Sequence, residues 1–491
     1  MIVDLTTDPD KLPGNCDVCI LGAGPAGIVT ALELARRRPE WHVVLLEGGS
    51  FGTPTEEERD PYRGESTGEL PYPLEGSRLR FLGGTSNHWG GWCRPLDAEN
   101  FATRSWIRNS GWPIGRDEMD PWYAVAAQWC EVPSTDYREE LLTPPLADVL
   151  LPVAESSLLR HKFFRFSPPT RFGTRYRQDL EQASNLQAFL RANANALMWS
   201  GERVTGVRVI GGDRTHDLTA RHVVVALGGI ESTRFLLNEA ERAPTRSGID
   251  SPALGRYFGD HFGRTPAAAL LPANLRYSRH DDHPQGAVMP VLALRPEAQR
   301  ELQTGDFCIT PMPQAETDGL PPGYGGNTAL GFRDGEYWSY RLQLIVEPPP
   351  NPDSRITLTD ERDHLGMRRL RLAWRADAED WRPSVASLRE IGAELGALGL
   401  GRVHMFPEAD FTAGDPGFGC HHMGSARMST DQEGGVVDPA CRVHGVENLY
   451  VASSAVFPAF GFSNPTLTIA ALAARLAVHL ASNTDATEAE A

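Results

Sequence analysis

The chain has 491 residues, of which 41 % are hydrophobic, so it can bury a large core over two or three domains. Its formal net charge of -17 is spread along the chain without a block of Lys and Arg, which excludes nucleic acid as a partner. The sequence contains no apolar run of membrane-spanning length and begins without the features of a signal peptide, so we predict no membrane segment and a cytoplasmic location.

Residues 16–49 follow the order strand, glycine turn, helix and strand, which predicts a βαβ unit. Gly22, Gly24 and Gly27 form G-x-G-x-x-G directly after the first strand. Such glycines permit a tight turn, let a pyrophosphate approach the backbone, and let helix and strand pack closely. Glu47 ends the second strand, where its carboxylate can accept hydrogen bonds from ribose hydroxyls. This pattern predicts a dinucleotide site but does not by itself separate FAD from NAD. FAD is favoured because the unit lies at the start of the chain and its sheet is completed by later sequence, which is common in flavoproteins.

The cysteines indicate a reduced protein. Seven is an odd and low number for this length, which fits free thiols better than disulfides. Cys16 and Cys19 lie in the first predicted strand, so we interpret them as core thiols. The cysteines are too scattered for an iron–sulfur cluster, and we predict no metal site.

Later elements predict a second domain inserted into the first. Residues 222–227 form a strand followed by another glycine turn and a helix, which returns the chain to the first sheet. Within 262–410 the pattern alternates, as in Y-W-S-Y-R-L-Q-L-I-V, which is typical of an antiparallel sheet. We therefore predict an α/β fold with a Rossmann-like FAD-binding domain and an inserted α+β substrate domain built on an antiparallel sheet.

The predicted boundaries make the FAD-binding domain discontinuous. It takes residues 1–100, 185–261 and 411–480, with 101–184 as a cap or connecting segment and 262–410 as the substrate-binding domain. Residues 481–491 form a polar tail that we expect to be disordered.

Several stretches together resemble the glucose-methanol-choline (GMC) oxidoreductases. They are G-A-G-P-A-G, E-G-G, L-G-G-T-S-N-H-W-G-G at 82–91, L-G-R-Y-F-G-D-H at 254–261, H-H-M-G-S-A-R-M at 421–428 and N-P-T-L-T-I-A-A-L-A at 464–473. The resemblance implies an FAD enzyme that oxidises alcohols. The motifs N-H-W and N-P-T-L-T look most like bacterial members that oxidise sugars or glycosides and like the pyranose oxidases.

The resemblance also implies further cofactor-binding residues: Gly84, Thr85, Asn87, His88, Ser453 and Thr466. Ser453 stands where many members have Asp, so a side-chain role of that Asp is absent, although the backbone amide could still serve FAD. In some relatives a histidine at the place of His88 is joined covalently to the flavin. We favour a non-covalent complex here and leave the link open.

Two residues are candidates for the chemistry. The family pattern His-x-x-Gly selects His421, three positions before Gly424, as the base, while His422 is expected to point away. Asn464, 43 positions after His421, matches the partner that faces the base across the substrate oxygen. Histidine suits a base near neutral pH, and an Asn amide can donate to an alkoxide. Asn464 before Pro465 would also make a good helix cap.

Arg341 and Gln343 share the polar face of a predicted strand and are candidates for substrate contacts, although a solvated face is an equal alternative. We therefore predict FAD-dependent oxidation of an alcohol to a carbonyl, with hydride transfer to flavin N5 and His421 as base. The expected substrate is a secondary hydroxyl of a sugar, glycoside or cyclitol, and the electrons pass to oxygen or another acceptor. The alternatives are a flavin-containing lyase of the same family, oxidation of a non-sugar alcohol, and a non-catalytic flavin-binding protein. The oligomeric state is left open.

Overall fold

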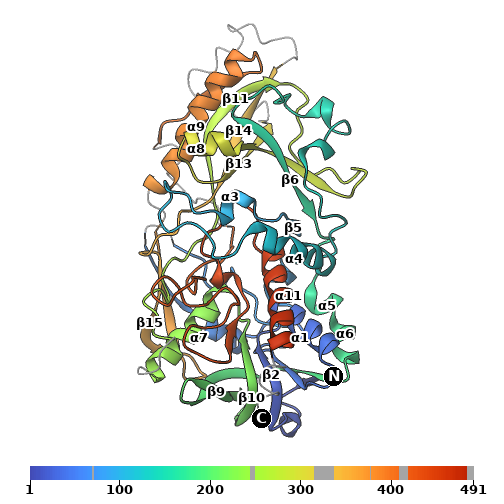
Figure 1. The fold of residues 1–491 in the computed structure, drawn as a ribbon, viewed down its shortest axis with the longest axis vertical. Helices are drawn as coiled ribbons and strands as arrows, with labels where there is room; N and C mark the ends of the chain where they lie inside the picture. The colour runs from blue at the N-terminus through green and yellow to red at the C-terminus, as the bar shows by residue number, and fades with distance from the viewer. Residues whose placement is uncertain (69–70, 244–248, 314–336, 376–377, 409–418, 484–491) are drawn as a thin grey trace.

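The computed structural model describes residues 1–68, 71–243, 249–313, 337–375, 378–408 and 419–483. Within these ranges the strands form three sheets. The molecule is elongated, with the largest sheet at one end of its long axis and an antiparallel sheet at the other (Figure 1). Of the predicted tail, 481–491, residues 481–483 are helical and residues 484–491 lie outside the described residues.

The first sheet confirms the predicted Rossmann-like unit. Its strands pair in the order β1 (Ile2–Asp4), β7 (Leu186–Leu190), β3 (Val43–Leu46), β2 (Asn15–Leu21), β10 (Arg214–Val225), β9 (Arg203–Gly211) and β8 (Asn193–Ser200), and β18 (Leu449–Val451) pairs with β10. The pairs from β1 to β10 and from β10 to β18 are parallel. Strands β2 and β3 are nearly continuous apolar runs because both of their faces are covered. Cys16 and Cys19 lie buried in β2 as free thiols, as predicted.

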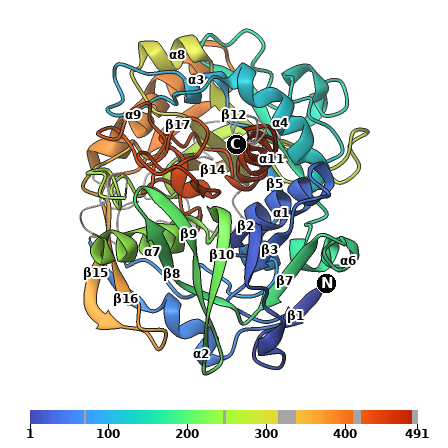
Figure 2. The ribbon, with the colours of Figure 1, turned by 60° about the horizontal axis from the view of Figure 1, so that its bottom comes forward.

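Helices cover this sheet and supply two of the site's walls. α1 (Pro25–Arg37) follows β2, and α7 (Gly229–Arg242) follows β10. α11 (Thr466–Asn483) packs along α1 and against α4 (Arg116–Trp129), which Figure 2 shows beside the sheet. α11 is rich in buried alanines, and such small side chains let helices approach closely. No described helix is long and apolar enough to cross a membrane.

The second sheet is antiparallel and has the strand order β17 (Arg402–Met405), β11 (Phe262–Pro272), β14 (Tyr337–Val346), β13 (Phe307–Pro313), β12 (Val288–Leu294), β6 (Leu159–Phe166) and β5 (Trp92–Cys93). The predicted alternation in β14 is present, since Tyr340, Leu342, Leu344 and Val346 are buried. Trp338 on the same face is 53 % exposed because it lies near the start of the strand.

One boundary differs from the sequence prediction. β5 and β6 come from segments that the sequence placed in the FAD-binding domain and in the cap, yet they extend the antiparallel sheet. β6 is almost wholly buried, so its sequence lacks the alternation that would have marked it as part of this sheet. α9 (Ala378–Ala397) lies against the sheet, with Leu388, Ile391 and Leu395 buried in the shared core.

A third, small sheet joins distant segments in the order β15 (Arg355–Arg362), β16 (Arg368–Trp374) and β4 (Gly64–Gly68). The remaining short helices are α2 (Glu56–Arg59), α3 (Ala98–Phe101), α5 (Phe172–Arg175), α6 (Arg177–Gln182) and α8 (Pro296–Glu301). The turn between β15 and β16 reaches back to the first domain.

Candidate active site

A cavity of about 770 Å³ extends from the glycine turn after β2 to the loop that carries His421. Its lining includes Gly22 and Gly24 at the turn, Glu47 at the end of β3, and both His421 and Asn464. The carboxyl ends of parallel strands meet at one edge of a sheet, where open α/β sheets bind their ligands. The fold therefore brings the two predicted sites into one continuous space.

The structure shows a different reason for glycine at each of the three positions of the turn. Gly22 has a φ of +100°, and an added Cβ would lie 2.5 Å from the carbonyl oxygen of Ala226. A Cβ on Gly27 would lie 1.9 Å from the carbonyl oxygen of Gly22, so this position holds α1 close to the turn. A Cβ on Gly24 would meet no atom of the described residues within 4 Å. Gly24 lines the cavity, so its missing side chain leaves room for a ligand beside the backbone.

Glu47 is buried and held by the backbone. Its carboxylate accepts hydrogen bonds from the amides of Ala23, at 3.0 Å, and Gly49, at 2.9 Å. Each carboxylate oxygen can accept a second hydrogen bond, so the side chain retains acceptors on the cavity side. This geometry suits a ribose diol.

The 3-10 turn Gly84–Asn87 forms the next wall. Gly84, Thr85 and His88 line the cavity. The side chain of Asn87 instead donates to the carbonyl oxygens of Leu82, at 3.0 Å, and Gly84, at 2.9 Å, so it shapes the turn from behind. Burial and the nearby guanidinium of Arg171 lower the pKa of His88, which favours its neutral form.

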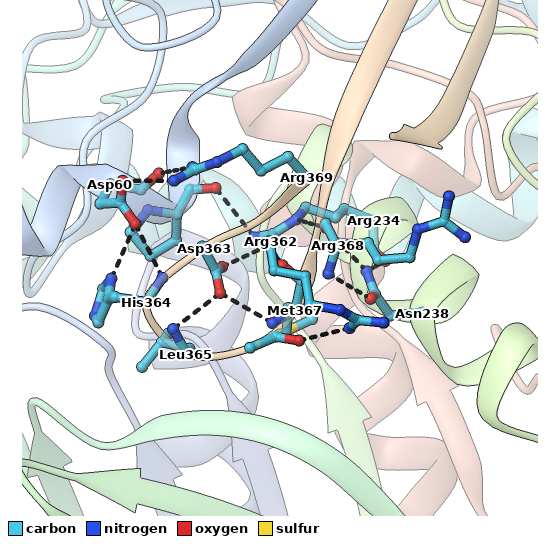
Figure 3. A network of polar contacts seen from close by, with 12 residues as sticks. Asp60, Arg234, Asn238, Arg362, Asp363, His364, Leu365, Met367, Arg368 and Arg369 are labelled. Carbon is cyan, nitrogen blue, oxygen red and sulfur yellow. Dashed lines mark hydrogen bonds and ion pairs between the residues drawn. The ribbon is translucent and has the colours of Figure 1, made fainter. Parts of the chain in front are cut away.

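Another wall of the cavity is a turn held by a buried ion pair (Figure 3). Leu365 and Met367 line the cavity, and their amides donate to Oδ1 of Asp363 at 2.9 and 3.0 Å. Oδ2 of Asp363 accepts from the guanidinium of Arg234 at 2.5 Å. The side chains of Asp363 and Arg234 are both fully buried, so this pair locks the β15–β16 turn onto α7.

At the other end of the cavity, Nδ2 of Asn464 lies 3.0 Å from Nε2 of His421. Asn464 precedes α11, and Ser453 and Thr466 also line the cavity. Burial lowers the pKa of His421 well below its usual value, and neighbouring His261 and His422 add to the effect. His421 is therefore neutral near neutral pH and able to accept a proton.

Sequence reasoning missed the groups behind His421. The backbone amide of His421 donates to Oδ1 of Asp260 at 2.8 Å, and the hydroxyl of Tyr72 donates to Oδ2 at 2.7 Å. Nδ1 of His261 lies 2.8 Å from Nδ1 of His421. Burial raises the pKa of Asp260 to about 7. The motif at 254–261 ends in Asp260 and His261, but sequence reasoning assigned it no role in the chemistry.

His422 was expected to point away from the site. Its ring does pack edge-on against Tyr72, with centroids 5.8 Å apart, but the residue also lines the cavity. Nε2 of His422 is buried and has no hydrogen-bond partner among the described residues. Burial lowers the pKa of His422 to about 3, so the ring is neutral.

The structure places the two candidates for substrate contacts differently, one inside the cavity and one outside it. Gln343 lines the cavity, together with Ile345 of the same strand. Arg341 is exposed and is not part of the cavity lining. The two side chains share a face, but a strand rises about 3.3 Å per residue, so Arg341 lies one repeat further from the site.

Residues 350–473 match the family model described as GMC oxidoreductase. The matched segment contains both His421 and Asn464. This part of the chain therefore carries a GMC oxidoreductase C-terminal domain.

Curated relatives are identical to this chain at about a quarter of the aligned positions. Paromamine 6'-oxidase of Streptomyces fradiae is 25 % identical, over 96 % of this chain and 92 % of its own. 2-methyl-1,2-propanediol dehydrogenase of Mycolicibacterium austroafricanum is also 25 % identical, over 96 % of this chain and 95 % of its own. C-glycoside 3-oxidase of Arthrobacter globiformis is 28 % identical, over 53 % of this chain and 46 % of its own.

Solved structures share the fold of this chain. Pyridoxine 4-oxidase from Mesorbium loti superposes with a TM-score of 0.57 at 19 % identity, over 95 % of this chain and 99 % of its own. A fungal aryl-alcohol oxidase superposes with a TM-score of 0.60 at 14 % identity, over 96 % of this chain and 99 % of its own.

These matches indicate an FAD-dependent enzyme that acts on CH–OH groups, and the cavity fits that cofactor. The open backbone at Gly24 lies at the start of α1, where a helix N-terminus favours a pyrophosphate. The carboxylate of Glu47 has acceptors left for a ribose. The same cavity reaches the His421–Asn464 pair, so one end can hold the nucleotide while the other holds the reacting groups.

Proposed function

We propose that this enzyme oxidises a secondary hydroxyl of a sugar, glycoside or aminocyclitol to a carbonyl at the His421–Asn464 pair. The observation that carries the proposal is the single cavity that joins the dinucleotide-binding turn to these two side chains. The redox cofactor must reach the carbon of the alcohol and the proton acceptor must reach its hydroxyl group. One cavity that contacts both sites makes this possible.

The proposed base is Nε2 of His421. This nitrogen lies 3.0 Å from the amide nitrogen of Asn464. A substrate hydroxyl that replaces this direct contact would donate its proton to Nε2 and accept a hydrogen bond from the amide nitrogen. The amide then stabilises the negative charge that develops on the oxygen, without competing for the proton.

The cofactor would be held by residues spread along the cavity: the backbone of Gly22 and Gly24, the carboxylate of Glu47, the 84–88 segment, and the backbone at Ser453 and Thr466. FAD, when bound, accepts the two electrons and the carbon-bound hydrogen that the alcohol loses. The chain itself removes the hydroxyl proton and orients the carbon.

Two features support a polyhydroxylated substrate. Gln343 of the antiparallel sheet offers an amide to the same cavity, and Gln can both donate to and accept from hydroxyl groups. In addition, relatives include paromamine 6'-oxidase and a C-glycoside 3-oxidase, whose names give a numbered position of paromamine and of a C-glycoside as the site of oxidation. Because one relative is a diol dehydrogenase, the test below also includes small non-sugar alcohols.

The test is the visible spectrum of the yellow enzyme while sugars, glycosides, aminocyclitols and small diols are added without oxygen. Bleaching by a cyclic polyol supports the proposal, and bleaching by small diols alone would contradict the substrate class. A yellow enzyme that none of the panel bleaches would contradict alcohol oxidation of these classes and would favour the lyase alternative.

The base role is tested by His421→Gln, with His216→Gln as the matched control because His216 lies on β10 outside the cavity. We expect the His421→Gln protein to retain FAD. The rate at which substrate reduces its flavin should be at least about 100-fold lower than in the wild type, which is the scale of one positioned base. The control should reduce at the wild-type rate. Equal rates in the two variants would remove His421 from the mechanism.

A further inference from the structure

Two histidine rings meet behind the reacting pair. Nδ1 of His261 lies 2.8 Å from Nδ1 of His421, and the rings stand edge-on at 83° with centroids 5.0 Å apart. Two ring nitrogens at this distance must share one hydrogen, because two N–H groups would clash and two lone pairs would repel each other. The question is which ring carries it.

The far side of His261 answers the question. Its Nε2 lies 2.8 Å from the carbonyl oxygen of Gly461, and a carbonyl oxygen only accepts, so Nε2 of His261 carries a hydrogen. Burial lowers the pKa of His261 to about 4, so the ring is neutral near neutral pH and its Nδ1 has only a lone pair. The shared hydrogen therefore belongs to Nδ1 of His421.

The contact of His421 with Asn464 agrees with this assignment. Nδ2 of Asn464 lies 3.0 Å from Nε2 of His421, and an amide nitrogen only donates. Nε2 of His421 must then be the nitrogen without a hydrogen. Both ends of the chain of hydrogen bonds give the same tautomer.

The acceptor that orients His261 is itself fixed in place. The amide of Gly461 donates to the carboxylate of Glu347 at 3.1 Å. Glu347 in turn accepts two hydrogen bonds from the guanidinium of Arg104, at 2.6 and 2.7 Å, and both side chains are buried. A bidentate pair of this kind fixes direction as well as distance. The Gly461 carbonyl therefore has little freedom to release His261.

We propose that His261 is a positioning residue that holds His421 in the tautomer with its hydrogen on Nδ1, which leaves the Nε2 lone pair facing the substrate. The inference rests on the base role proposed above for His421. A histidine with its hydrogen on Nε2 could not take a hydroxyl proton through that nitrogen, and an acceptor at Nδ1 is how proteins select the reactive tautomer. Here the acceptor is a second, neutral imidazole.

The tautomer can be measured without substrate. Nuclear magnetic resonance of the holoenzyme with isotope-labelled histidine nitrogens shows which nitrogen carries a hydrogen, and the signals of His421 are assigned by their loss in His421→Gln. We expect hydrogens on Nδ1 of His421 and Nε2 of His261, with a coupling between the two Nδ1 atoms across the hydrogen bond. A hydrogen on Nε2 of neutral His421, or on Nδ1 of His261, would overturn the proposal.

Two variants test whether His261 is the cause. His261→Leu removes the acceptor at similar volume, and His261→Asn puts an acceptor oxygen near the position of Nδ1. We expect a second His421 tautomer in the Leu variant and the wild-type tautomer alone in the Asn variant, with FAD bound in both. An unchanged tautomer in a yellow, folded His261→Leu protein would overturn the proposal. If that variant does not fold, the wild-type couplings alone decide.

None of these signals depends on turnover. A wrong tautomer assignment would therefore be seen even if His421→Gln reduces slowly, and a failed base role would be seen even if the tautomer is as expected. The two proposals fail separately.

Discussion

Alanine substitutions at two glycines of one turn should have opposite effects on folding and on cofactor binding. Gly24 and Gly27 are only three residues apart, yet the structure gives their hydrogens different surroundings. A Cβ at Gly27 would lie 1.9 Å from the carbonyl oxygen of Gly22, whereas a Cβ at Gly24 would enter the cavity. We expect Gly27→Ala to destabilise the fold and Gly24→Ala to weaken FAD binding.

The contact distances set the expected sizes. Relieving the contact at Gly27 requires α1 and the turn to separate by more than about 1 Å, and overpacking of this kind costs about 1–3 kcal/mol or more. Gly24 has φ -77° and ψ -174°, which alanine adopts freely, so we expect a stability loss of only about 0.5 kcal/mol. A methyl group at Gly24 would displace a phosphate from charge-assisted hydrogen bonds of about 1.5–3 kcal/mol each. The affinity for FAD should then fall about 10- to 100-fold.

The measurements are the ratio of FAD to protein after purification, with and without added FAD, and the thermal unfolding midpoint of each variant. The expected result is a folded Gly24→Ala protein that is poor in FAD and a Gly27→Ala protein with a clearly lower midpoint. A Gly24→Ala protein that retains FAD as the wild type does would refute the interpretation of the open backbone. Equal destabilisation of both variants would refute the difference between the two positions.

Two further predictions concern buried carboxyl groups. Burial raises the pKa of Asp260 to about 7, so ionisation of its carboxyl group opposes folding. As the pH rises from about 4 to about 7, the free energy of unfolding of the wild type should fall by up to about 4 kcal/mol relative to that of Asp260→Asn. Chemical denaturation of both proteins across this pH range measures the difference, and parallel pH curves would contradict the prediction. Asp363→Ala should cost at least about 3 kcal/mol because it leaves the buried guanidinium of Arg234 without this partner. Asp360→Ala in the same hairpin removes an exposed ion pair and is the control, so equal unfolding midpoints for the two variants would argue against a locked turn.

The sequence was sufficient where function depends on local geometry. The glycine turn needs glycines at fixed spacing, and Glu47 follows from the length of one βαβ unit, so both positions could be predicted from neighbouring residues. His421 and Asn464 were found through the resemblance of their motifs to a family. The structure then brings them to 3.0 Å, a contact that spacing alone could not have given.

Contacts between distant segments could not be predicted. His261 meets His421 across 160 residues, and Tyr72 meets Asp260 across 188. β6 joins the antiparallel sheet through pairing with β12, although its buried sequence does not alternate. In each case the partner is chosen by the packing of whole elements, which leaves no local pattern in the sequence.

The position of His421 depends on both sheets. Asp260 and His261 are adjacent residues just before β11 of the antiparallel sheet, and they hold the backbone amide and the ring of His421 respectively. Asn464, on the other side of the ring, precedes α11, which packs on the first domain. A relative shift of the two domains would therefore separate His421 from one of its neighbours. It follows that substitutions between the domains, far from the cavity, should slow flavin reduction before they release FAD, because the nucleotide end of the cavity is built mainly by the first sheet.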